Sequence, residues 1–501
     1  MAPPTDLAKV GKEGFALLDE CLGRKVSKPT QQPHAYQLQK MGTQYLPRKE
    51  DIDCYQAFQM YGGTLIVEYR TIREYSTNKP PRLRVGMAMT KSDVKAILLL
   101  CLALLAFGPK CTFGGRPGAD SAPAGSGTVF NVLTYGAQAG GKKDNTQAFM
   151  KAWLAACHSK GDAKLLIPTG TFLVGQVAFQ GPCSTSSPIV VELQGTVIAP
   201  TDVSEFPSPE WFSFEKLDGL IVTGGGTFDG QGAAVWKYNN CKKSSNCQLL
   251  PTSIKFSYVT NGEVRTIHSI NSKAFHFHIN NCDNIKVHDI SITAPGDSPN
   301  TDGIHVSSSN LVNISKVAIG TGDDCVSIGQ GSTDISITGV TCGPGHGISV
   351  GSLGKYPNEK DVKGVTVKNC TLKNSDNGVR IKTWPGSNPS LASSFIFEDI
   401  IVDNVKNPII IDQQYCAGSS CKKNPSRVQI SDVHYKNIRG TSTSEVAVDI
   451  ICSPQFPCED VELDDIDIKY SGVKAKSLGA SSACSNAKVV YGGVQNPPPC
   501  P

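Results

Sequence analysis

The segment Ile285-Lys-Val-His-Asp-Ile-Ser-Ile292 decides the fold, because its spacing of apolar residues recurs along the second half of the chain. Apolar side chains stand at positions x, x+2, x+5 and x+7, and the next copy is Val312-Asn-Ile-Ser-Lys-Val-Ala-Ile319. The x/x+2 pair predicts a short strand with alternate side chains inward, and x+5/x+7 predicts a second strand after a bend. We assign seven copies, which begin at Ile285, Val312, Ile335, Val365, Phe395, Val428 and Val461.

Most copies are followed by a third apolar pair. These pairs are Ile304/Val306, Val326/Ile328, Ile348/Val350, Val379/Ile381 and Ile409/Ile411. Three short strands per repeat of 23–33 residues, with β-branched side chains inside and Gly, Asn, Asp and Ser at the corners, are typical of a parallel β-helix. Helical repeats would need a spacing of 3.6 residues, and a β-sandwich would not keep one inward template through seven copies. We therefore expect an all-β chain whose residues 128–501 form one right-handed parallel β-helix, a solenoid.

A solenoid exposes apolar surface at its ends unless other elements cover them. Asp144-Asn-Thr-Gln147 matches the start of a helix with a capping box, and Phe149, Trp153 and Cys157 then lie along one side of that helix. The sequence therefore predicts an N-terminal capping helix over Gln147–Cys157.

Charge is distributed unevenly along the 501 residues. Residues 1–110 contain 16 Lys/Arg and 10 Asp/Glu, a balance of +6, whereas the remaining residues contain 32 and 34, a balance of −2. The main body therefore lacks the basic surface that nucleic-acid binding requires. We expect no nucleic-acid partner.

The cysteines indicate an oxidising compartment. Fourteen of the 18 cysteines follow residue 150, and the pairs Cys241/Cys247, Cys416/Cys421 and Cys452/Cys458 would close short loops. No C-x-x-C pair occurs in the sequence, which argues against structural zinc.

An apolar segment, Ala96–Phe107, follows the basic stretch that starts at Met89-Thr-Lys91. This pattern is typical of a secretory signal peptide over residues 89–110, and the apolar run is too short to span a bilayer. The alternative is a buried core helix. Because signal peptides act at the N-terminus, residues 1–88 are an extension of unknown status: an artefact of the gene prediction, or a real cytosolic domain before a signal anchor.

Titratable residues gather at one register position of the repeat. Asp302, Asp324 and His346 each stand two residues before the third apolar pair of their turn, at intervals of 22 residues, and Asp323 adjoins them. Equivalent positions in successive turns stack about 4.8 Å apart, so we expect these groups to form a ladder on one outer face. Close acids raise at least one pKa, and an acid beside an ionised carboxylate is the pairing that glycoside hydrolysis needs.

Two cations join this predicted ladder from the next turn. Val379 and Ile381 point inward, so Arg380 and Lys382 point outward beside the acids. A single Asp at a solenoid corner is usually a turn residue, which is how we interpret Asp376. The text Gly347-Ile-Ser-Val-Gly351 matches a hydrolase elbow, but it lies on a repeat strand with no following helix, so we attribute the match to chance. The remaining histidines, His305 among them, are interpreted as exposed or packing residues.

Four short motifs together resemble the signature of polygalacturonases, glycoside hydrolase family 28. They are Asn300-Thr-Asp302, Gly322-Asp-Asp-Cys325, Gly345-His-Gly347 and Arg380-Ile-Lys382. The order and spacing of the four are much more specific than any one of them. The resemblance covers residues 128–501 and implies secretion to the plant cell wall and hydrolysis of α-1,4-linked galacturonate in pectin, with inversion. It implies no cofactor, no metal, no membrane contact after signal cleavage, and a monomer.

The resemblance also implies roles for individual residues. Asp323 would be the general acid, Asp302 and Asp324 would activate water, and His346 would support the acid. Arg380, Lys382 and Tyr415 would bind substrate, as would Asn300 of the first motif, and Cys325–Cys342 would be a disulfide beside the site.

The segments Ser352-Leu-Gly-Lys-Tyr-Pro-Asn-Glu-Lys360 and Gln495-Asn-Pro-Pro-Pro-Cys500 are similar to those of pollen-type exopolygalacturonases, which release single galacturonate units from a chain end. Three alternatives remain open at this point: an endo-acting polygalacturonase, a pectate or pectin lyase on the same fold, and a non-catalytic wall-binding solenoid.

Overall fold

The computed structural model describes residues 57–61, 64–68, 127–241, 247, 249–417, 423–475 and 477–501. The chain divides into two compact units, Met1–Ala119 and Asp120–Pro501. In the first unit, β1 (Ala57–Tyr61) pairs antiparallel with β2 (Thr64–Glu68). The predicted signal peptide at 89–110 lies outside the described residues. Within the described ranges, no helix has the length and apolar character needed to cross a membrane.

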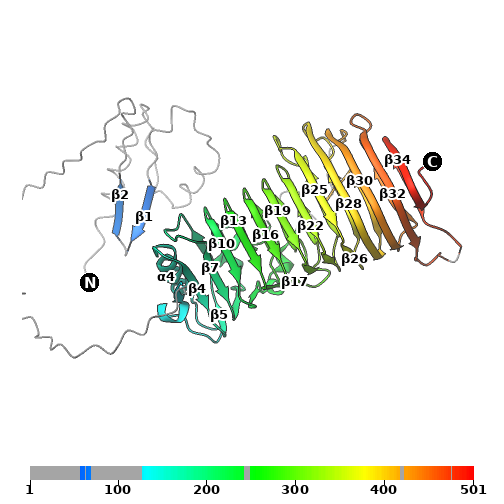
Figure 1. Ribbon diagram of the computed structural model, residues 1–501. Coiled ribbons are helices and arrows are strands. Elements are labelled where there is room, and N and C mark those ends of the chain that lie inside the picture. The colour runs from blue at the N-terminus through cyan, green and yellow to red at the C-terminus, as the bar shows by residue number, and fades with distance from the viewer. Residues whose placement is uncertain are drawn as a thin grey trace, which may run out of the picture. The chain divides into compact units, whose positions relative to one another are not determined.

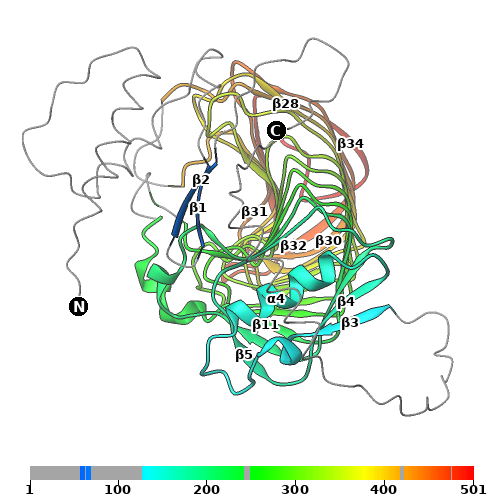
Figure 2. The same ribbon diagram turned by 90° about the vertical axis from the view of Figure 1, so that its left-hand side faces the viewer.

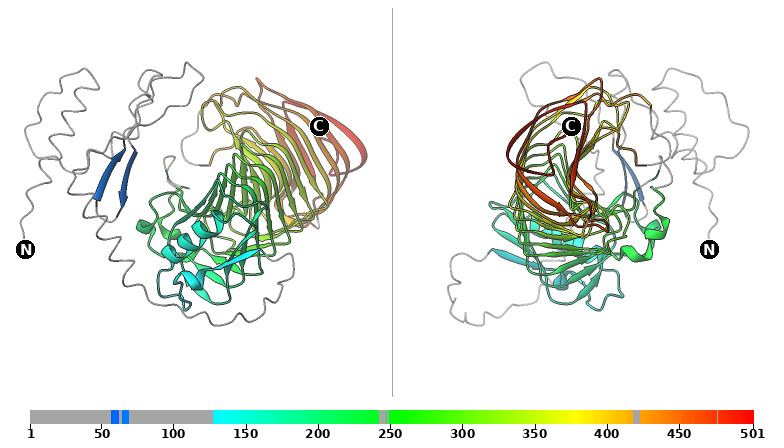
Figure 3. Two further views of the ribbon diagram at one scale, coloured as in Figure 1. Left: turned by 60° about the vertical axis from the view of Figure 1, so that its left-hand side comes forward. Right: turned by 90° about the vertical axis from the view of Figure 1, so that its right-hand side faces the viewer.

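The second unit is a parallel β-helix, as the repeat predicts. Its strands follow one another side by side along the solenoid in Figure 1, and the stacked coils are visible in both panels of Figure 3. The described strands pair in parallel into one 11-stranded sheet and one 21-stranded sheet. We call the 11-stranded sheet the site sheet, because its strands carry the predicted third apolar pairs.

The strands of the site sheet are β6 (Val177–Gln180), β9 (Glu210–Glu215), β12 (Thr252–Ser257), β15 (Phe277–Asn280), β18 (Ile304–Ser307), β21 (Val326–Ile328), β24 (Ile348–Leu353), β27 (Asn377–Thr383), β29 (Asn407–Asp412), β31 (Val446–Ile451) and β33 (Ser481–Ser485). The strands of the larger sheet are β3 (Thr128–Asn131), β4 (Ala163–Ile167), β5 (Thr171–Leu173), β7 (Ile189–Leu193), β8 (Thr196–Ile198), β10 (Asp218–Thr223), β11 (Thr227–Asp229), β13 (Thr260–Arg265), β14 (His268–Ile270), β16 (Asp283–His288), β17 (Ser291–Thr293), β19 (Asn310–Ser315), β20 (Ala318–Gly320), β22 (Thr333–Thr338), β23 (Thr341–Cys342), β25 (Val362–Lys368), β26 (Thr371–Lys373), β28 (Ser390–Val405), β30 (Val428–Ser442), β32 (Cys458–Tyr470) and β34 (Ala487–Asn496). The described helices are α4 (Thr146–Cys157) and the 3₁₀ segments η2 (Val132–Tyr135), η3 (Val203–Glu205), η4 (Gly232–Ala234) and η5 (Trp236–Tyr238).

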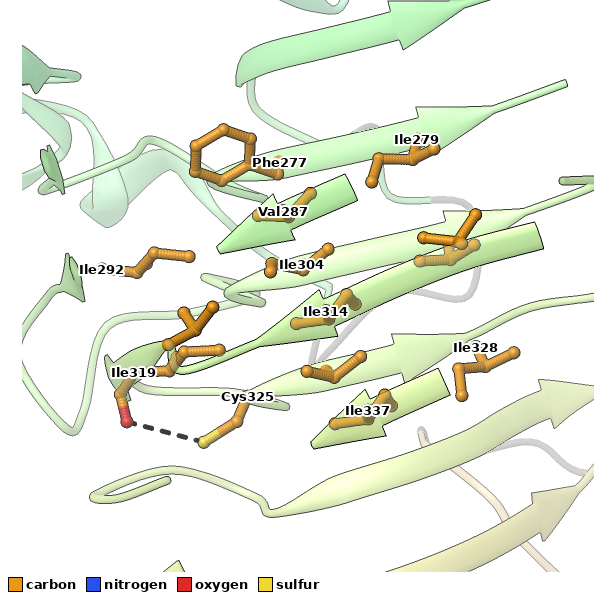
Figure 4. Packing of buried hydrophobic residues seen from close by; sticks show 14 of the residues in the cluster. Phe277, Ile279, Val287, Ile292, Ile304, Ile314, Ile319, Cys325, Ile328 and Ile337 are labelled. Atoms are coloured by element: carbon orange, nitrogen blue, oxygen red, sulfur yellow. Dashed lines mark hydrogen bonds between the residues drawn. The ribbon is translucent and has the colours of Figure 1, made fainter. Parts of the chain in front are cut away.

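The core is built from columns of apolar side chains that repeat turn after turn. Ile285 of β16 pairs with Val312 of β19, and Val312 pairs with Ile335 of β22, as the template requires. All these side chains are buried. Figure 4 shows the same arrangement from close by, with Ile304 of the site sheet and Ile314 of the larger sheet both pointing into the interior. Burying a side chain of this size stabilises the fold by about 1.5–3 kcal/mol, so the repeated columns are the main source of stability.

One of the seven predicted copies was placed in the wrong register. Phe395 pairs with Val433 and not with Val428, so the copy begins at Val433, five residues later. The backbone agrees: left-handed residues mark positions x−1 and x+4 of every copy, and here they are Asp432 and Asn437. The error arose because β30 is long, and the inward-pointing pair at Val428 and Ile430 also fits the spacing. The stacked turns also begin before Ile285, where the first copy was assigned, because β4 already pairs in parallel with β7.

The predicted capping helix is α4, which lies across the N-terminal end of the solenoid in Figure 2. Phe149, Trp153 and Cys157 are all buried beneath it, and the Trp153 ring stacks on Phe179 with centroids 4.6 Å apart. The predicted capping box is wrong. The Asp144 carboxylate accepts a hydrogen bond from the backbone N–H of Thr146 (3.0 Å), two residues on, which makes a local turn in front of the helix.

Disulfides tie the corners of the solenoid. The predicted pairs Cys325–Cys342, Cys241–Cys247 and Cys452–Cys458 are present, together with Cys157–Cys183 and Cys484–Cys500. Cys416 is also disulfide-bonded, and Cys421 lies outside the described residues. Among the described cysteines, Cys282 and Cys370 are free and buried, and burial raises the pKa of each thiol to about 11. These two cysteines are therefore core residues and not reactive thiols.

Candidate active site

The predicted acids converge because of strand register in the site sheet. Ile304, Val326 and Ile348 pair in sequence across β18, β21 and β24, which places the residues two positions earlier in adjacent turns. Those residues are Asp302, Asp324 and His346. The ladder is not on an exposed face, however. Asp302 is 6% exposed and Asp324 only 1%, because neighbouring polar side chains cover both carboxylates.

Asp324 is held by two cations and a hydroxyl group. Arg380 Nη2 lies 2.7 Å from Asp324 Oδ1, and Lys382 Nζ lies 2.6 Å from Oδ2. Ser349 Oγ donates to Oδ1 at 2.8 Å and accepts from Arg380 Nε at 3.0 Å. All four groups are largely buried. Both predicted cations therefore reach the acids, where each forms an ion pair with Asp324.

Asp302 has different neighbours. Ser327 Oγ donates to Asp302 Oδ2 at 2.6 Å, and Ser327 Oγ also lies 2.7 Å from His305 Nδ1. The His305 ring stacks on Phe275 with centroids 4.8 Å apart. Successive turns thus repeat one arrangement, an Asp bound by the Ser 25 residues later in the chain. The group that contacts the Ser hydroxyl differs between the two turns. It is the His305 imidazole beside Asp302 and the Arg380 guanidinium beside Asp324.

Asp323 faces His346. His346 Nδ1 lies 2.9 Å from Asp323 Oδ1, which also accepts the backbone N–H of Asp324 at 2.9 Å. Asn300 Nδ2 donates to Asp323 Oδ2 at 3.4 Å. The exposed Asp376, which we interpreted as a turn residue, lies with Oδ2 3.7 Å from His346 Nε2. The imidazole is thus bracketed by carboxylates on both ring nitrogens.

These contacts separate the protonation equilibria of the site. Burial raises the pKa of Asp302 well above its usual value, and the nearby Asp323 and Asp324 charges raise it further. Burial alone would also raise the pKa of Asp324, but the Lys382 and Arg380 charges lower it to about 2. The hydrogen bond to Asp323 raises the pKa of His346. The site therefore holds one carboxylate, Asp324, that stays ionised and another, Asp302, that is protonated more readily.

Tyr415 borders the cations, as predicted for a residue of this site. Lys382 Nζ lies 5.2 Å and the Arg380 guanidinium carbon 5.9 Å from the centre of its ring. Burial raises the pKa of the Tyr415 hydroxyl, so it stays protonated and can donate a hydrogen bond.

A metal is a poor fit for the cluster of Asp323, Asp324 and His346, although ligand atoms of these residues lie within 4.8 Å of one another. Both oxygens of Asp324 are already paired with cationic groups, and Nδ1 of His346 is bound to Asp323. A metal ion there would meet the positive charges of Arg380 and Lys382.

Sequence reasoning missed three polar residues of the site: Ser327, Ser349 and His305. All three occupy one outward-facing row of the site sheet, in which His305 pairs with Ser327, Ser327 with Ser349, and Ser349 with Arg380. All three occupy the same position of the repeat as Arg380, and aligning the repeat on Arg380 could have identified them. The Gly347–Gly351 text is indeed not a hydrolase elbow, because Ser349 lies within β24 and its partners are Asp324 and Arg380.

A loop from the N-terminal side of the solenoid reaches the acids. The residues between β11 and β12 include η4, η5 and the Cys241–Cys247 disulfide. Asn239 Nδ2 in this loop donates to Asn300 Oδ1 at 3.0 Å, and Asn300 contacts Asp323. This loop thus contacts the site through Asn300, whereas Tyr415 borders it at Lys382.

Comparison with known proteins agrees with this geometry. The family model described as glycosyl hydrolases family 28 matches residues 157–493. The chain is 49% identical to an exopolygalacturonase of Platanus acerifolia over 74% of this chain and 97% of that protein. It is 48% identical to an Arabidopsis thaliana protein named exopolygalacturonase, over 77% of this chain and 91% of that protein. The exopolygalacturonase structure from Thermotoga maritima shares the fold, with a TM-score of 0.61 at 19% identity over 74% of this chain and 92% of that chain. With the family model covering most of the solenoid and all four motifs gathered at one place, the chain belongs to the glycosyl hydrolases family 28 and is a glycoside hydrolase.

Proposed function

We propose that this protein is an exo-acting polygalacturonase, which hydrolyses α-1,4-galacturonosyl linkages of pectin and releases galacturonate from a chain end. The observation that carries the proposal is the cluster of Asp302, Asp323 and Asp324 around two buried cations. A polyanionic substrate needs such cations, since residues 111–501 as a whole have a balance of −2, and Arg and Lys both pair well with carboxylates.

In the proposed reaction, protonated Asp323 donates its proton to the leaving glycosidic oxygen as the bond from the anomeric carbon to that oxygen breaks. A carboxylate on the opposite face takes a proton from water, whose oxygen forms the new bond to that carbon. Asp302 suits the base role once it is ionised, because its raised pKa makes it the more basic carboxylate. Asp324 stays ionised and stabilises the positive charge that develops on the sugar.

The remaining residues would position the acid and the substrate. His346 Nδ1 contacts one oxygen of Asp323 and Asn300 Nδ2 contacts the other, so the two side chains fix the position of that carboxyl group. Arg380 and Lys382 would attract the substrate carboxylates while holding Asp324, and Tyr415 would line the sugar next to them.

Exo action is supported by the names of the two plant relatives and by the loop between β11 and β12. An exo-acting enzyme needs a cleft that is closed on one side of its acids, and the contact of Asn239 with Asn300 makes this loop the candidate for that role.

Product analysis on polygalacturonate tests the proposal. We expect monomeric galacturonate from the first time points, with slow loss of viscosity and no ultraviolet absorbance from unsaturated products. Early oligomers with a collapse of viscosity would indicate endo action, unsaturated products would indicate a lyase, and binding without turnover would indicate a non-catalytic solenoid.

We further propose that the active form is a secreted monomer of the plant cell wall whose N-terminus lies after residue 110. The support is the basic stretch and apolar run within residues 89–110 and the disulfides of the solenoid. N-terminal sequencing of the extracellular enzyme should recover no residue of 1–88. Recovery of that segment would contradict the proposal.

A further inference from the structure

The loop that follows β24 presents a lysine and a tyrosine beside the site. Its shape is fixed by Glu359, whose carboxylate accepts the backbone N–H groups of Gly354 at 2.6 Å and Tyr356 at 2.8 Å. Lys355 and Tyr356 lie at the exposed tip, and Tyr356 is 63% exposed. The Lys355 ammonium nitrogen lies 5.4 Å from the Tyr356 ring centre and 5.5 Å from that of Trp384.

Lys355 differs from the other site cations because it has no carboxylate partner. Arg380 and Lys382 both pair with Asp324. Among the described residues, no carboxylate lies within ion-pair distance of the Lys355 ammonium, which contacts two aromatic rings instead. An ammonium held over aromatic rings remains available to an incoming anion.

Trp384 connects this lysine to the active site. It follows β27 directly, and its backbone N–H donates to Leu353 at the end of β24 at 2.8 Å. Its ring packs edge-on against Tyr415 with centroids 5.4 Å apart, and Tyr415 borders Lys382. The Trp384 indole N–H is buried and has no hydrogen-bond acceptor among the described residues. A buried donor without an acceptor is costly, and a bound ligand would supply one.

We propose that Lys355, Tyr356 and Trp384 form a second uronate subsite beyond Tyr415, on the side of the acids away from the Asn239 loop. This inference rests on the proposed function. Three consecutive galacturonate units would then be bound. The first lies before the scissile bond, the second lies after it beside Arg380 and Tyr415, and the third, the second on the leaving side, lies at Lys355. Its carboxylate would pair with Lys355, and the apolar face of its ring would lie on the aromatic side chains.

Substrate length tests this subsite. Digalacturonate fills only the two positions next to the scissile bond, whereas trigalacturonate also reaches the third. Lys355→Met should raise KM for trigalacturonate about fivefold and leave KM for digalacturonate within about twofold. Trp384→Phe keeps a ring and removes the N–H, so it should give the same pattern with a smaller change.

The control is Lys360→Met, in the same loop but without a contact to these rings, and it should change neither KM. Equal effects of Lys355→Met on both substrates, or no effect on trigalacturonate, would overturn the subsite. Failure of the wild-type enzyme to hydrolyse either substrate would instead contradict the proposed function.

Discussion

Asp323→Asn should lower kcat by about 10²–10⁴ while leaving folding and oligogalacturonate binding nearly intact. The amide has almost the volume of the acid, but it cannot donate a proton with the strength that the leaving oxygen requires. Asp323 is largely covered, and it contacts His346, Asn300 and the backbone N–H of Asp324, contacts that an amide oxygen can partly retain. The measurements are kcat on polygalacturonate, the thermal unfolding midpoint, and calorimetric binding of an oligogalacturonate.

Asp376→Asn is the matched control for this variant. Asp376 also approaches His346, from the other ring nitrogen at 3.7 Å, but its side chain is exposed. The control should keep kcat near the wild-type value. If Asp323→Asn keeps more than about a tenth of kcat, the acid assignment is wrong, and Asp302 and Asp324 become the candidates.

Lys382→Met should have the largest effect on stability among the site variants. It removes one of two cations from a carboxylate that is 1% exposed, and an uncompensated buried charge typically costs about 3–5 kcal/mol. Arg380 remains bound to Asp324, so we expect about 3 kcal/mol, together with a strong loss of kcat/KM. Chemical denaturation and steady-state kinetics measure the two effects.

A double variant separates lost charge pairing from lost packing. Asp324→Asn combined with Lys382→Met also takes the carboxylate away from the buried Arg380, so it should be less stable than Lys382→Met alone and should remain inactive. Lys368→Met is the control, because Lys368 pairs with Glu398 at the surface at 2.6 Å and should contribute no more than about 1 kcal/mol. A Lys382→Met variant as stable as this control would contradict the burial argument.

Much of the fold could be predicted because the solenoid core is a linear pattern. Each inward column is a run of residues at a fixed spacing, so Ile285, Val312 and Ile335 could be aligned without a structure. The spacing became ambiguous where strands lengthen, and for this reason the copy at Val433 was assigned to Val428. The turns before Ile285 were not aligned to the template, although residues from 128 onward were assigned to the same domain.

The site was predictable in its members but not in its contacts. Backbone register places Asp302, Asp324 and His346 in adjacent turns, which the sequence spacing already shows. Side-chain direction at a corner does not follow from spacing. The sequence therefore could not show that His346 binds Asp323, or that Lys382 is buried against Asp324. Ser327 was not singled out, and Ser349 was set aside with the Gly347–Gly351 match, because an outward-facing serine on a solenoid strand carries no spacing signal of its own.

The measurement that tests the central claim most directly is proton NMR of the first minutes of oligogalacturonate hydrolysis. In the proposed reaction one carboxyl group donates to the leaving oxygen while another activates water for direct attack, and this single displacement inverts the anomeric carbon. We predict that the released galacturonate appears first as the β-anomer and reaches the α/β equilibrium only later, by mutarotation. Initial release of the α-anomer, or of an unsaturated sugar, would contradict the account.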